Sequence, residues 1–243
     1  MTGPLDTVRA HGLPDPLDAL VDRASALVPA EGRAVLGIAG SPGAGKTSLA
    51  VRLTELLNAR FQEGRDGSPG PFAAHLPMDG FHLAESTLGR LGRLDRKGAI
   101  DTFDGWGFVA LLERLRAETQ HTVYAPGFDR RVEEPIAGEI AVEPGTRLVV
   151  VEGNYLLATD DPWARVKGLL DESWFCSTAD DVRADRLVAR HQEGGRSEED
   201  ARAWAEDVDR RNAVLIEATR SRADLIVSGD GAGVPGGRST VGG

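Results

Sequence analysis

The sequence predicts an α/β fold in three layers, with helices covering both faces of a mainly parallel central sheet. Three observations lead to this prediction. Short apolar segments alternate along the chain with segments of helical periodicity, as in successive βαβ units. The apolar segments are nearly continuous, which is typical of strands that are buried on both faces. At 243 residues, 41% of them hydrophobic, the chain can bury the core of one domain.

The first part of the chain is expected to hold two helices and two strands. Residues 1–15 are polar and contain prolines and glycines, so they are expected to form a flexible arm. Apolar side chains recur every three or four residues in 16–28 and in 46–61, as on one face of a helix. Apolar runs bounded by loop residues predict strands at 33–39 and 72–78.

The rest of the chain is expected to continue the alternation. Residues 147–151 (Arg-Leu-Val-Val-Val) form its strongest predicted strand, and Ser197 with Asp200 forms a capping box that begins a long helix. The other expected elements are helices at 106–117, within 156–170, at 180–191 and at 197–220, strands at 121–124, 174–176 and 223–227, and loops at 93–104 and 126–135. One domain is therefore expected over 16–228, with a small helical lid at about 183–200 and a disordered, glycine-rich tail at 229–243.

Composition excludes several classes of protein. The 38 acidic and 28 basic residues give a net charge of −10, which argues against a nucleic-acid binder. The only cysteine, Cys176, lies in an apolar segment, so it is expected to be buried and cannot form an internal disulfide or a cysteine-rich zinc site. No apolar run is long enough to span a membrane, and the N-terminus does not resemble a signal peptide. We therefore expect a cytoplasmic protein that does not bind membranes.

A phosphate-binding loop is the strongest functional motif. Residues 40–47 match G-x-x-x-x-G-K-S/T between a predicted strand and a predicted helix, which is the context that this motif requires. Backbone N–H groups and the helix N-terminus bind phosphate oxygens in such a loop. We expect Lys46 to reach the β- and γ-phosphates of ATP and the Thr47 hydroxyl to ligate Mg²⁺. The expected nucleotide-binding residues of this P-loop are Gly40, Ser41, Pro42, Gly43, Ala44, Gly45, Lys46, Thr47 and Ser48.

Two acidic residues follow predicted strands. Asp79 comes after the strand at 72–78, and Glu152 comes after the strand at 147–151. Both should lie at the carboxyl edge of the sheet, where open α/β folds bind their ligands. One acid could hold the metal ion while the other accepts the proton of an attacking hydroxyl. The alternative is that each acid only ends its strand in a turn.

Several segments together resemble the phosphoribulokinase/uridine kinase/pantothenate kinase group. They are residues 40–47, 79–82, 96–98, 102–104 and 152–155, and the resemblance extends over about residues 33–227. The match is best to a branch of nucleoside- and nucleotide-kinase-like proteins that includes fructose kinases. The resemblance implies a P-loop NTPase fold and an ATP-dependent kinase with a small-molecule hydroxyl acceptor. It also implies that Asp79 is the catalytic base and that Glu152 belongs to the Mg²⁺ shell.

The departures from this group concern the acceptor. The tyrosine-rich segment of bacterial pantothenate kinase is not visible in the chain. Uridine kinases carry a tyrosine and a histidine for the pyrimidine, and Arg130 stands where that histidine is expected, downstream of Tyr124. The identity of the acceptor is therefore left open.

A cluster of arginines marks the expected lid. Arg183, Arg186 and Arg190 share one face of the predicted helix 180–191, and Gly194 and Gly195 form a flexible joint after it. Arginines of a mobile lid can stabilise the charge that develops on the γ-phosphate. The resemblance implies this catalytic role for Arg186 and Arg190. The alternative is a solvated helix face whose arginines pair with nearby acids.

The candidate acceptor residues lie around these motifs. They are Asp79, His82, Lys97, Asp104, Tyr124, Phe128, Arg130, Asn154 and Tyr155. Asp104 could instead cap the following helix, and His82 could be structural. The segments 79–82, 97–104 and 124–131 together carry three cations and four anions, which suits a neutral polyhydroxyl acceptor better than a sugar phosphate. The four tryptophans, at 106, 163, 174 and 204, are interpreted as core or helix-packing residues.

Two other functions would also be compatible with a P-loop. A GTP-driven switch or metallochaperone would also use a P-loop, but the lysines at 46, 97 and 167 do not form the N-K-x-D segment of guanine-specific proteins. A pantothenate kinase-like enzyme is a further alternative. The leading hypothesis is a kinase that phosphorylates a nucleoside such as uridine or a sugar such as fructose, and a homodimer is left open.

Overall fold

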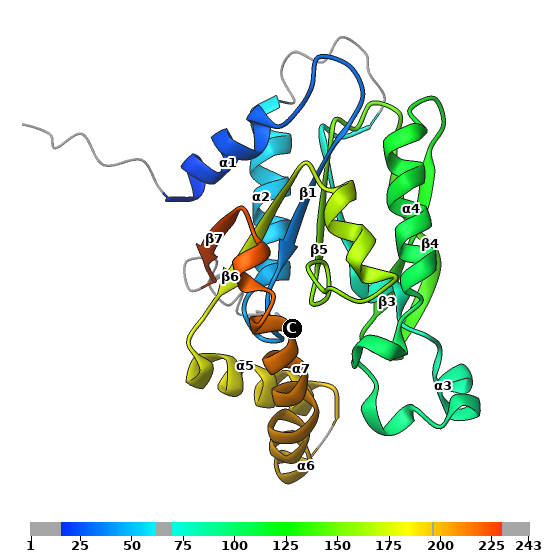
Figure 1. Cartoon of the computed structure of the whole chain (residues 1–243), viewed down its shortest axis with the longest axis vertical. Helices are drawn as coiled ribbons and strands as arrows, with labels where there is room; N and C mark the ends of the chain where they lie inside the picture. The colour runs from blue at the N-terminus through cyan, green and yellow to red at the C-terminus, as the bar shows by residue number, and fades with distance from the viewer. Residues whose placement is uncertain (1–15, 62–69, 196, 230–243) are drawn as a thin grey trace, which may run out of the picture.

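The structure, a computed structural model, describes residues 16–61, 70–195 and 197–229 (Figure 1). The predicted arm at 1–15 lies outside these residues, as does the predicted tail apart from Gly229. The strands are β1 (Ala34–Ala39), β2 (Ala73–Pro77), β3 (Val123–Asp129), β4 (Glu134–Val142), β5 (Leu148–Gly153), β6 (Glu172–Ser177) and β7 (Leu225–Ser228). The α-helices are α1 (Pro16–Ala26), α2 (Lys46–Phe61), α3 (Glu85–Leu91), α4 (Gly105–Ala117), α5 (Asp180–Glu193), α6 (Glu198–Trp204) and α7 (Arg210–Glu217).

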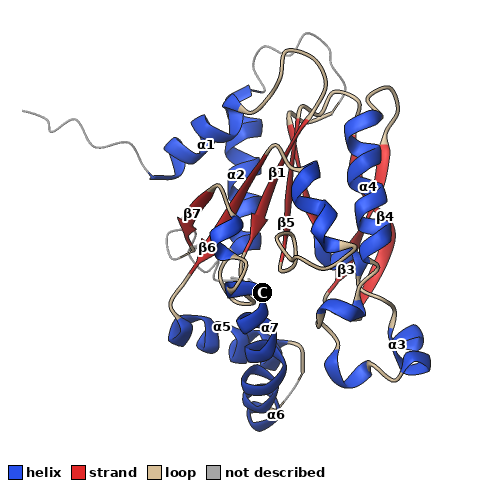
Figure 2. Ribbon diagram, in the orientation of Figure 1, coloured by secondary structure: helices blue, strands red, loops and turns tan. Residues whose placement is uncertain are grey.

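The central sheet confirms the predicted α/β fold. Its strand order is β2-β5-β1-β6-β7, and every neighbouring pair is parallel (Figure 2). All residues of β1 and β5 are buried, because both strands lie inside the sheet and helices cover both faces.

Side chains along each strand alternate between two apolar cores. On β1, Leu36 and Ile38 belong to the core beneath α1 and α2, whereas Val35 belongs to the core beneath α4. The predicted helix within 156–170 is a short 3₁₀ helix, Trp163–Leu169, and it packs beside α4. Cys176 is fully buried in the α2-side core, as predicted. This alternation produces the three layers, because neighbouring strand residues point to opposite faces of a sheet.

The parallel register places three functional segments at one edge. Ile38 near the end of β1 and Pro77 at the end of β2 both pair with Glu152 on β5. The P-loop follows β1 directly, and Asp79 lies two residues beyond the end of β2. The sheet therefore brings the P-loop, Asp79 and Glu152 to the same carboxyl edge, as expected for this fold.

The segment predicted as a loop at 126–135 is part of a β-hairpin, so that prediction was wrong. Strand β3 continues to Asp129, and β4, which was not predicted, pairs with it in antiparallel fashion. Strand β4 is mostly exposed and lacks an apolar run, and this explains why its pattern did not indicate a strand. The hairpin packs against the short helical turn Met78–Phe81, which contains Asp79.

Helices α5, α6 and α7, which follow β6, gather at the carboxyl edge of the sheet (Figure 1). The long helix predicted at 197–220 is interrupted, because α6 and α7 are joined by a π-helical turn, Ala205–Asp209. The predicted cap is confirmed, since the Ser197 hydroxyl accepts a hydrogen bond from the backbone N–H of Asp200 at 3.1 Å. The π-helical turn changes the register of side chains between α6 and α7.

Candidate active site

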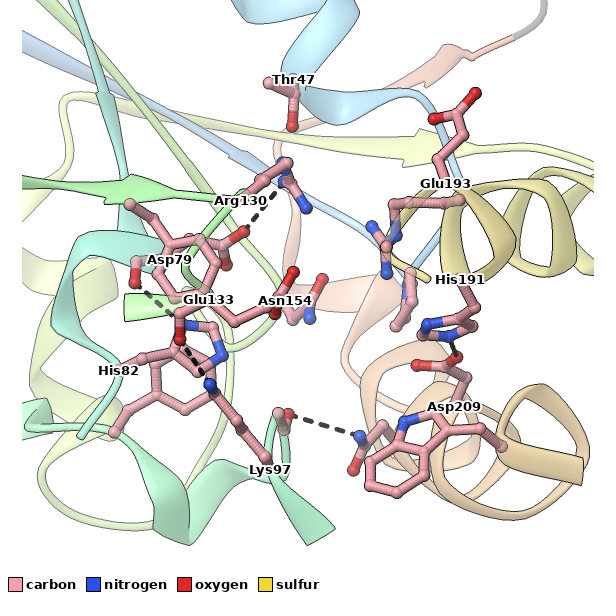
Figure 3. Close-up of a pocket in the computed structure, with 18 of the residues that line it drawn as sticks. Thr47, Asp79, His82, Lys97, Arg130, Glu133, Asn154, His191, Glu193 and Asp209 are labelled. Atoms are coloured by element: carbon pink, nitrogen blue, oxygen red, sulfur yellow. Dashed lines mark hydrogen bonds and ion pairs between the residues drawn. The ribbon is translucent and has the colours of Figure 1, made fainter. Parts of the chain in front are cut away.

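A pocket of about 430 Å³ opens at the carboxyl edge of the sheet (Figure 3). The P-loop, the ends of β2 and β5, the β3–β4 hairpin and the helices α5 to α7 contribute to its walls. Many of the sequence-predicted site residues line it, namely Pro42, Lys46, Thr47, Asp79, His82, Lys97, Phe128, Arg130, Glu152, Asn154 and Arg190. Asp104, Tyr124, Tyr155 and Arg186 are not part of its lining, and neither are the other predicted P-loop residues, Gly40, Ser41, Gly43, Ala44, Gly45 and Ser48.

The P-loop is held in a curled conformation by its own lysine. Gly43 and Gly45 have φ angles of 77° and 90°, which other residues rarely adopt. The Lys46 ammonium is buried and donates a hydrogen bond to the carbonyl of Ser41 at 3.0 Å. Burial lowers the pKa of Lys46, and the neighbouring Glu152 carboxylate offsets part of that effect. The Ser41 hydroxyl donates to Glu217 Oε1 at 2.6 Å, which ties the loop to the end of α7.

Thr47 and Glu152 form a pair of oxygen groups beside the P-loop. The Thr47 hydroxyl donates to Glu152 Oε1 at 3.0 Å, and His75 Nε2 lies 3.7 Å from the same oxygen. Burial alone would raise the pKa of Glu152, but His75, Lys46 and Thr47 stabilise the charged form and bring it below its usual range. An ionised carboxylate next to a hydroxyl is a donor set that suits Mg²⁺.

Asp79 lies on the facing side of the same edge. Its Oδ2 accepts a hydrogen bond from Arg130 of the hairpin at 3.3 Å. The glycine after each strand-end acid allows close packing here. A Cβ atom on Gly80 would come within 2.1 Å of the Pro126 carbonyl oxygen, and one on Gly153 would come within 2.4 Å of Met78 Cβ. These two glycines therefore let the hairpin and the β2 turn approach the sheet edge.

His82 is held between aromatic rings next to Asp79. Its ring centre lies 4.0 Å from that of Phe103 and 4.8 Å from that of Phe128, and its Nδ1 lies 2.8 Å from the Asp79 carbonyl oxygen. Burial lowers the pKa of His82, and the effect of Asp79 opposes this only in part. Lys97 packs over Phe128 with its ammonium 5.9 Å from the ring centre, and it donates to Glu85 at 3.0 Å. His82 and Lys97 thus form part of a well-packed pocket wall.

The arginines of α5 attach that helix to the P-loop. Arg183 is buried and donates to the carbonyl of Pro42 at 3.0 Å, and Arg186 donates to the carbonyl of Gly43 at 3.3 Å. Arg190, further along the helix, lines the pocket. This arrangement differs from the solvated helix face that was the alternative interpretation, because two of the three arginines contact the phosphate-binding loop itself.

Three predicted acceptor residues have other positions. Asp104 accepts a hydrogen bond from the backbone N–H of Gly107 at 2.8 Å, so it is the N-cap of α4. Tyr124 is 61% exposed. Tyr155 is buried, and its hydroxyl donates to the carbonyl of Gly98 at 2.7 Å. Asp104 thus caps α4, which was the alternative to acceptor binding. Tyr155 contacts a pocket residue, Gly98, from behind the pocket lining.

The structure adds a wall of the pocket that no motif indicated. Four residues form this wall, and we call them the helical wall. They are His191 from α5, Trp204 at the end of α6, Asp209 from the π-helical turn and Asn212 from α7. Trp204 is half-buried and also lines the pocket, which its prediction as a core or helix-packing residue did not include. The prediction was wrong for Trp106, which is 56% exposed, whereas Trp163 and Trp174 are buried as predicted.

The charges that line the pocket are nearly balanced. The lining contains five cations and six anions. The cations are Lys46, Lys97, Arg130, Arg131 and Arg190, and the anions are Asp79, Glu85, Glu133, Glu152, Glu193 and Asp209. Among the described residues, no group of three or more histidine, cysteine or acidic side chains is placed to hold a metal ion by itself. Within the same residues, no helix has the length and apolar character needed to cross a bilayer.

Comparisons with known proteins agree with this geometry. The model of the "Phosphoribulokinase / Uridine kinase family" matches residues 35–231. A Schizosaccharomyces pombe protein named "Putative uridine kinase C227.14" is 32% identical over 216 residues, which cover 86% of this chain and 89% of the relative. The relative and the family model thus match the same body of the chain, including the P-loop and both strand-end acids.

Solved structures show the same architecture. The crystal structure of a "putative fructose transport system kinase" from Silicibacter sp. TM1040 has a TM-score of 0.77 and 36% sequence identity, and the match covers 88% of this chain and 99% of that one. The structure of YFH7 from Saccharomyces cerevisiae has a TM-score of 0.75 at 18% identity, over 88% of this chain and 98% of that one. The second likeness concerns the fold alone.

Proposed function

Because the chain belongs to the phosphoribulokinase/uridine kinase family and is a phosphotransferase, we propose that it transfers the γ-phosphate of ATP to a hydroxyl group of a small neutral metabolite, a nucleoside or a free sugar. One observation carries this proposal. Lys46 and Thr47 of the P-loop and the carboxylate of Asp79 line a single pocket at the edge of the sheet. Phosphoryl transfer needs a phosphate cradle facing a group that can accept a proton.

The nucleotide would bind along the P-loop. Its phosphates would contact the backbone N–H groups that precede α2 and the positive N-terminus of that helix. The Lys46 ammonium would exchange its hydrogen bond to the Ser41 carbonyl for phosphate oxygens, which are stronger partners for a buried cation. Arg190 lines the pocket and Arg186 donates to the carbonyl of Gly43, which supports a role for both in stabilising charge on the transferred group.

Thr47 and Glu152 would hold Mg²⁺. They fit that role because a hydroxyl and an ionised carboxylate lie 3.0 Å apart at the end of β5, next to the phosphate loop. The metal ion would neutralise charge on the β- and γ-phosphates when it is bound. The buried carboxylate of Glu152 is in turn held by His75 and Lys46, which keeps it ionised.

Asp79 would act as the general base. Its Oδ2 would accept the proton of the acceptor hydroxyl as that oxygen attacks the γ-phosphorus and the bond to the β-γ bridging oxygen breaks. The contact with Arg130 would loosen in this step, because Oδ2 must be available to the hydroxyl. Arg130 is half exposed on the hairpin, so its side chain has room to move.

The near balance of charge in the pocket supports a neutral acceptor. A phosphorylated acceptor would add about two negative charges beside ATP. The pocket already holds six anions against five cations, and Lys46 and Arg190 are committed to the nucleotide. The names of two relatives, which refer to uridine and to fructose, point to compounds of this neutral, polyhydroxyl class.

The test is transfer of radiolabelled γ-phosphate from ATP to uridine, D-fructose, pantothenate or D-ribulose 5-phosphate, with a sample that lacks acceptor. We expect uridine or D-fructose to give the highest kcat/KM, and we expect Lys46→Ala to remove the transfer. A higher kcat/KM for D-ribulose 5-phosphate would contradict the neutral acceptor, and one for pantothenate would favour the pantothenate kinase-like alternative. ATP hydrolysis that no acceptor alters would favour an NTPase switch.

A further inference from the structure

The helical wall faces the proposed catalytic base across the pocket. In Figure 3, Asp209 and His191 lie on one side and Asp79 on the other, with Asn154 between them. Neither the P-loop chemistry nor the proposed base uses Asp209, although it is a charged group that is almost fully buried. A buried carboxylate is costly unless it is paired or serves a ligand, so its position needs an explanation.

Asp209 is fixed at one oxygen and available at the other. Its Oδ2 lies 2.8 Å from His191 Nε2, and the side chains of Asp209 and His191 are only 9% and 15% exposed. Oδ1 takes no hydrogen bond from any of the residues that the structure describes. Figure 3 shows this second oxygen turned toward the interior of the pocket. His191 thus sets the orientation of an acceptor group that faces the bound molecule.

The π-helical turn brings the members of the helical wall together. In an α-helix, residues five apart, such as Trp204 and Asp209, are separated by about 140° around the axis. The i→i+5 hydrogen bonding of the turn Ala205–Asp209 places residues at that spacing near one face. Asn212 follows Asp209 by three residues and shares its face, and its Nδ2 is anchored to the Gly98 carbonyl at 3.3 Å.

We propose that Asp209 and Asn212 form the subsite that selects the acceptor, by accepting hydrogen bonds from two neighbouring hydroxyls of a ring-shaped polyol. This inference rests on the proposed kinase function and assigns the part of the pocket that reads the acceptor. An ionised carboxylate only accepts hydrogen bonds, so the molecule must supply donors there. Trp204 offers an apolar face for the ring carbons, and His191 is a positioning residue that acts through Asp209.

The experiment measures acceptor binding and turnover in parallel. Protein loaded with a non-hydrolysable ATP analogue and Mg²⁺ is titrated calorimetrically with two series of compounds. The first series is uridine, 2′-deoxyuridine and 3′-deoxyuridine, and the second is D-fructose and 3-deoxy-D-fructose. Steady-state kinetics follow for every compound that binds. The variant is Asp209→Asn, which keeps the shape of the side chain. The matched control is Asp207→Asn on the same turn, because Asp207 is 69% exposed, pairs with Arg211 and does not line the pocket.

For the wild type, we expect uridine or D-fructose to bind and a missing hydroxyl to weaken binding by about 10- to 100-fold, the scale of a hydrogen bond to a charged group. Asp209→Asn should weaken the parent compound to a similar extent and remove its advantage over the deoxy compound that lacks the hydroxyl bound by Asp209. Its affinity for the ATP analogue should stay within about 2-fold of wild type, as expected for a change confined to acceptor binding. Asp207→Asn should match wild type throughout.

His191 supplies a second variant. His191→Ala should raise the KM for the acceptor but not for ATP, and His191→Gln should recover much of the loss, because glutamine can still donate to Asp209. Full discrimination against every deoxy compound in Asp209→Asn would overturn the proposal, as would failure of both parent compounds to bind. Binding of an amino alcohol in place of both would overturn the ligand class.

Failure of the subsite and failure of the kinase assignment give different results. If Lys46→Ala abolishes phosphate transfer and Asp209→Asn behaves like wild type, the kinase stands and the subsite is wrong. If the deoxy compounds are discriminated through Asp209 but no phosphate is transferred to any of them, the subsite stands and the proposed function is wrong.

Discussion

Replacing Asp79 with asparagine should remove most of the turnover and leave nucleotide binding intact. Asp79 Oδ2 accepts a hydrogen bond from Arg130 at 3.3 Å, and 27% of the side chain is exposed in the pocket. The amide keeps this shape and contact but cannot take up a proton at neutral pH. Since a positioned base contributes about 10²- to 10⁴-fold to a rate, kcat should fall by that factor. The increase in the barrier is then about 3–5 kcal/mol.

Glu152→Gln should lower the rate for a different reason. Glu152 is 4% exposed, accepts a hydrogen bond from Thr47 and opposes the positive charge of Lys46. Glutamine can keep the bond to Thr47 but removes the charge that would bind Mg²⁺. Raising the Mg²⁺ concentration should therefore restore part of the activity of this variant by mass action. It should not restore that of Asp79→Asn, whose defect is in proton transfer.

The assay measures kcat at saturating ATP and acceptor over a series of Mg²⁺ concentrations. Calorimetric titration of each variant with a non-hydrolysable ATP analogue gives the nucleotide affinity, and Asp207→Asn serves as an exposed-carboxylate control. We expect unchanged nucleotide affinity for Asp79→Asn, and we expect Mg²⁺ above the concentration that saturates the wild type to raise the rate of Glu152→Gln but not that of Asp79→Asn. An identical Mg²⁺ response in the two variants would refute the division of roles between the two acids.

Three further predictions concern other parts of the molecule. Lys46→Ala should lower kcat by about 10³-fold, because the cation beside the phosphates is lost, and wild-type kcat at saturating ATP would contradict the P-loop role. Arg33→Met should lower the free energy of unfolding by about 3 kcal/mol in urea titrations without changing kcat/KM. Arg33 is buried and donates to the carbonyls of Leu115, Glu118, Glu143 and Thr146, so an unchanged urea midpoint would show these bonds to be dispensable. The lowered pKa of His82 means that the unfolded chain binds its proton more readily than the native protein does. The free energy of unfolding should therefore fall as the pH drops below the unfolded pKa of 6.5, and an equal slope in His82→Gln would rule out this assignment.

The parts of the site that sequence could predict are those fixed by local pattern. The P-loop is recognised by the fixed spacing of its glycines, lysine and threonine. The apolar runs before Asp79 and Glu152 place both acids at strand ends. Parallel register then brings them together, as the pairing of Pro77 and Ile38 with Glu152 shows. Each of these inferences needs only a few neighbouring residues and the general rule for open α/β sheets.

The rest of the site depends on features without a local signal. The helical wall forms because a π-helical turn shifts the register between Trp204 and Asp209, and an expectation of regular α-helix separates these two side chains. Strand β4 is held by its pairing with β3 and not by an apolar pattern of its own. For Asp104, capping and acceptor binding were equally compatible with the sequence, and only the hydrogen bond from Gly107 distinguishes them.

The π-helical turn makes the geometry of the helical wall sensitive to chain length as well as to residue type. Inserting one residue with α-helical winding between Ala205 and Val208 would rotate Asp209 by about 100° relative to Trp204. A deletion there would instead leave the two residues at the i, i+4 spacing of a regular helix, on one face. The insertion would separate these two residues of the helical wall without replacing either of them. An insertion at this single turn would thus be a route by which a kinase with the proposed subsite could exchange one acceptor for another while its P-loop stays the same.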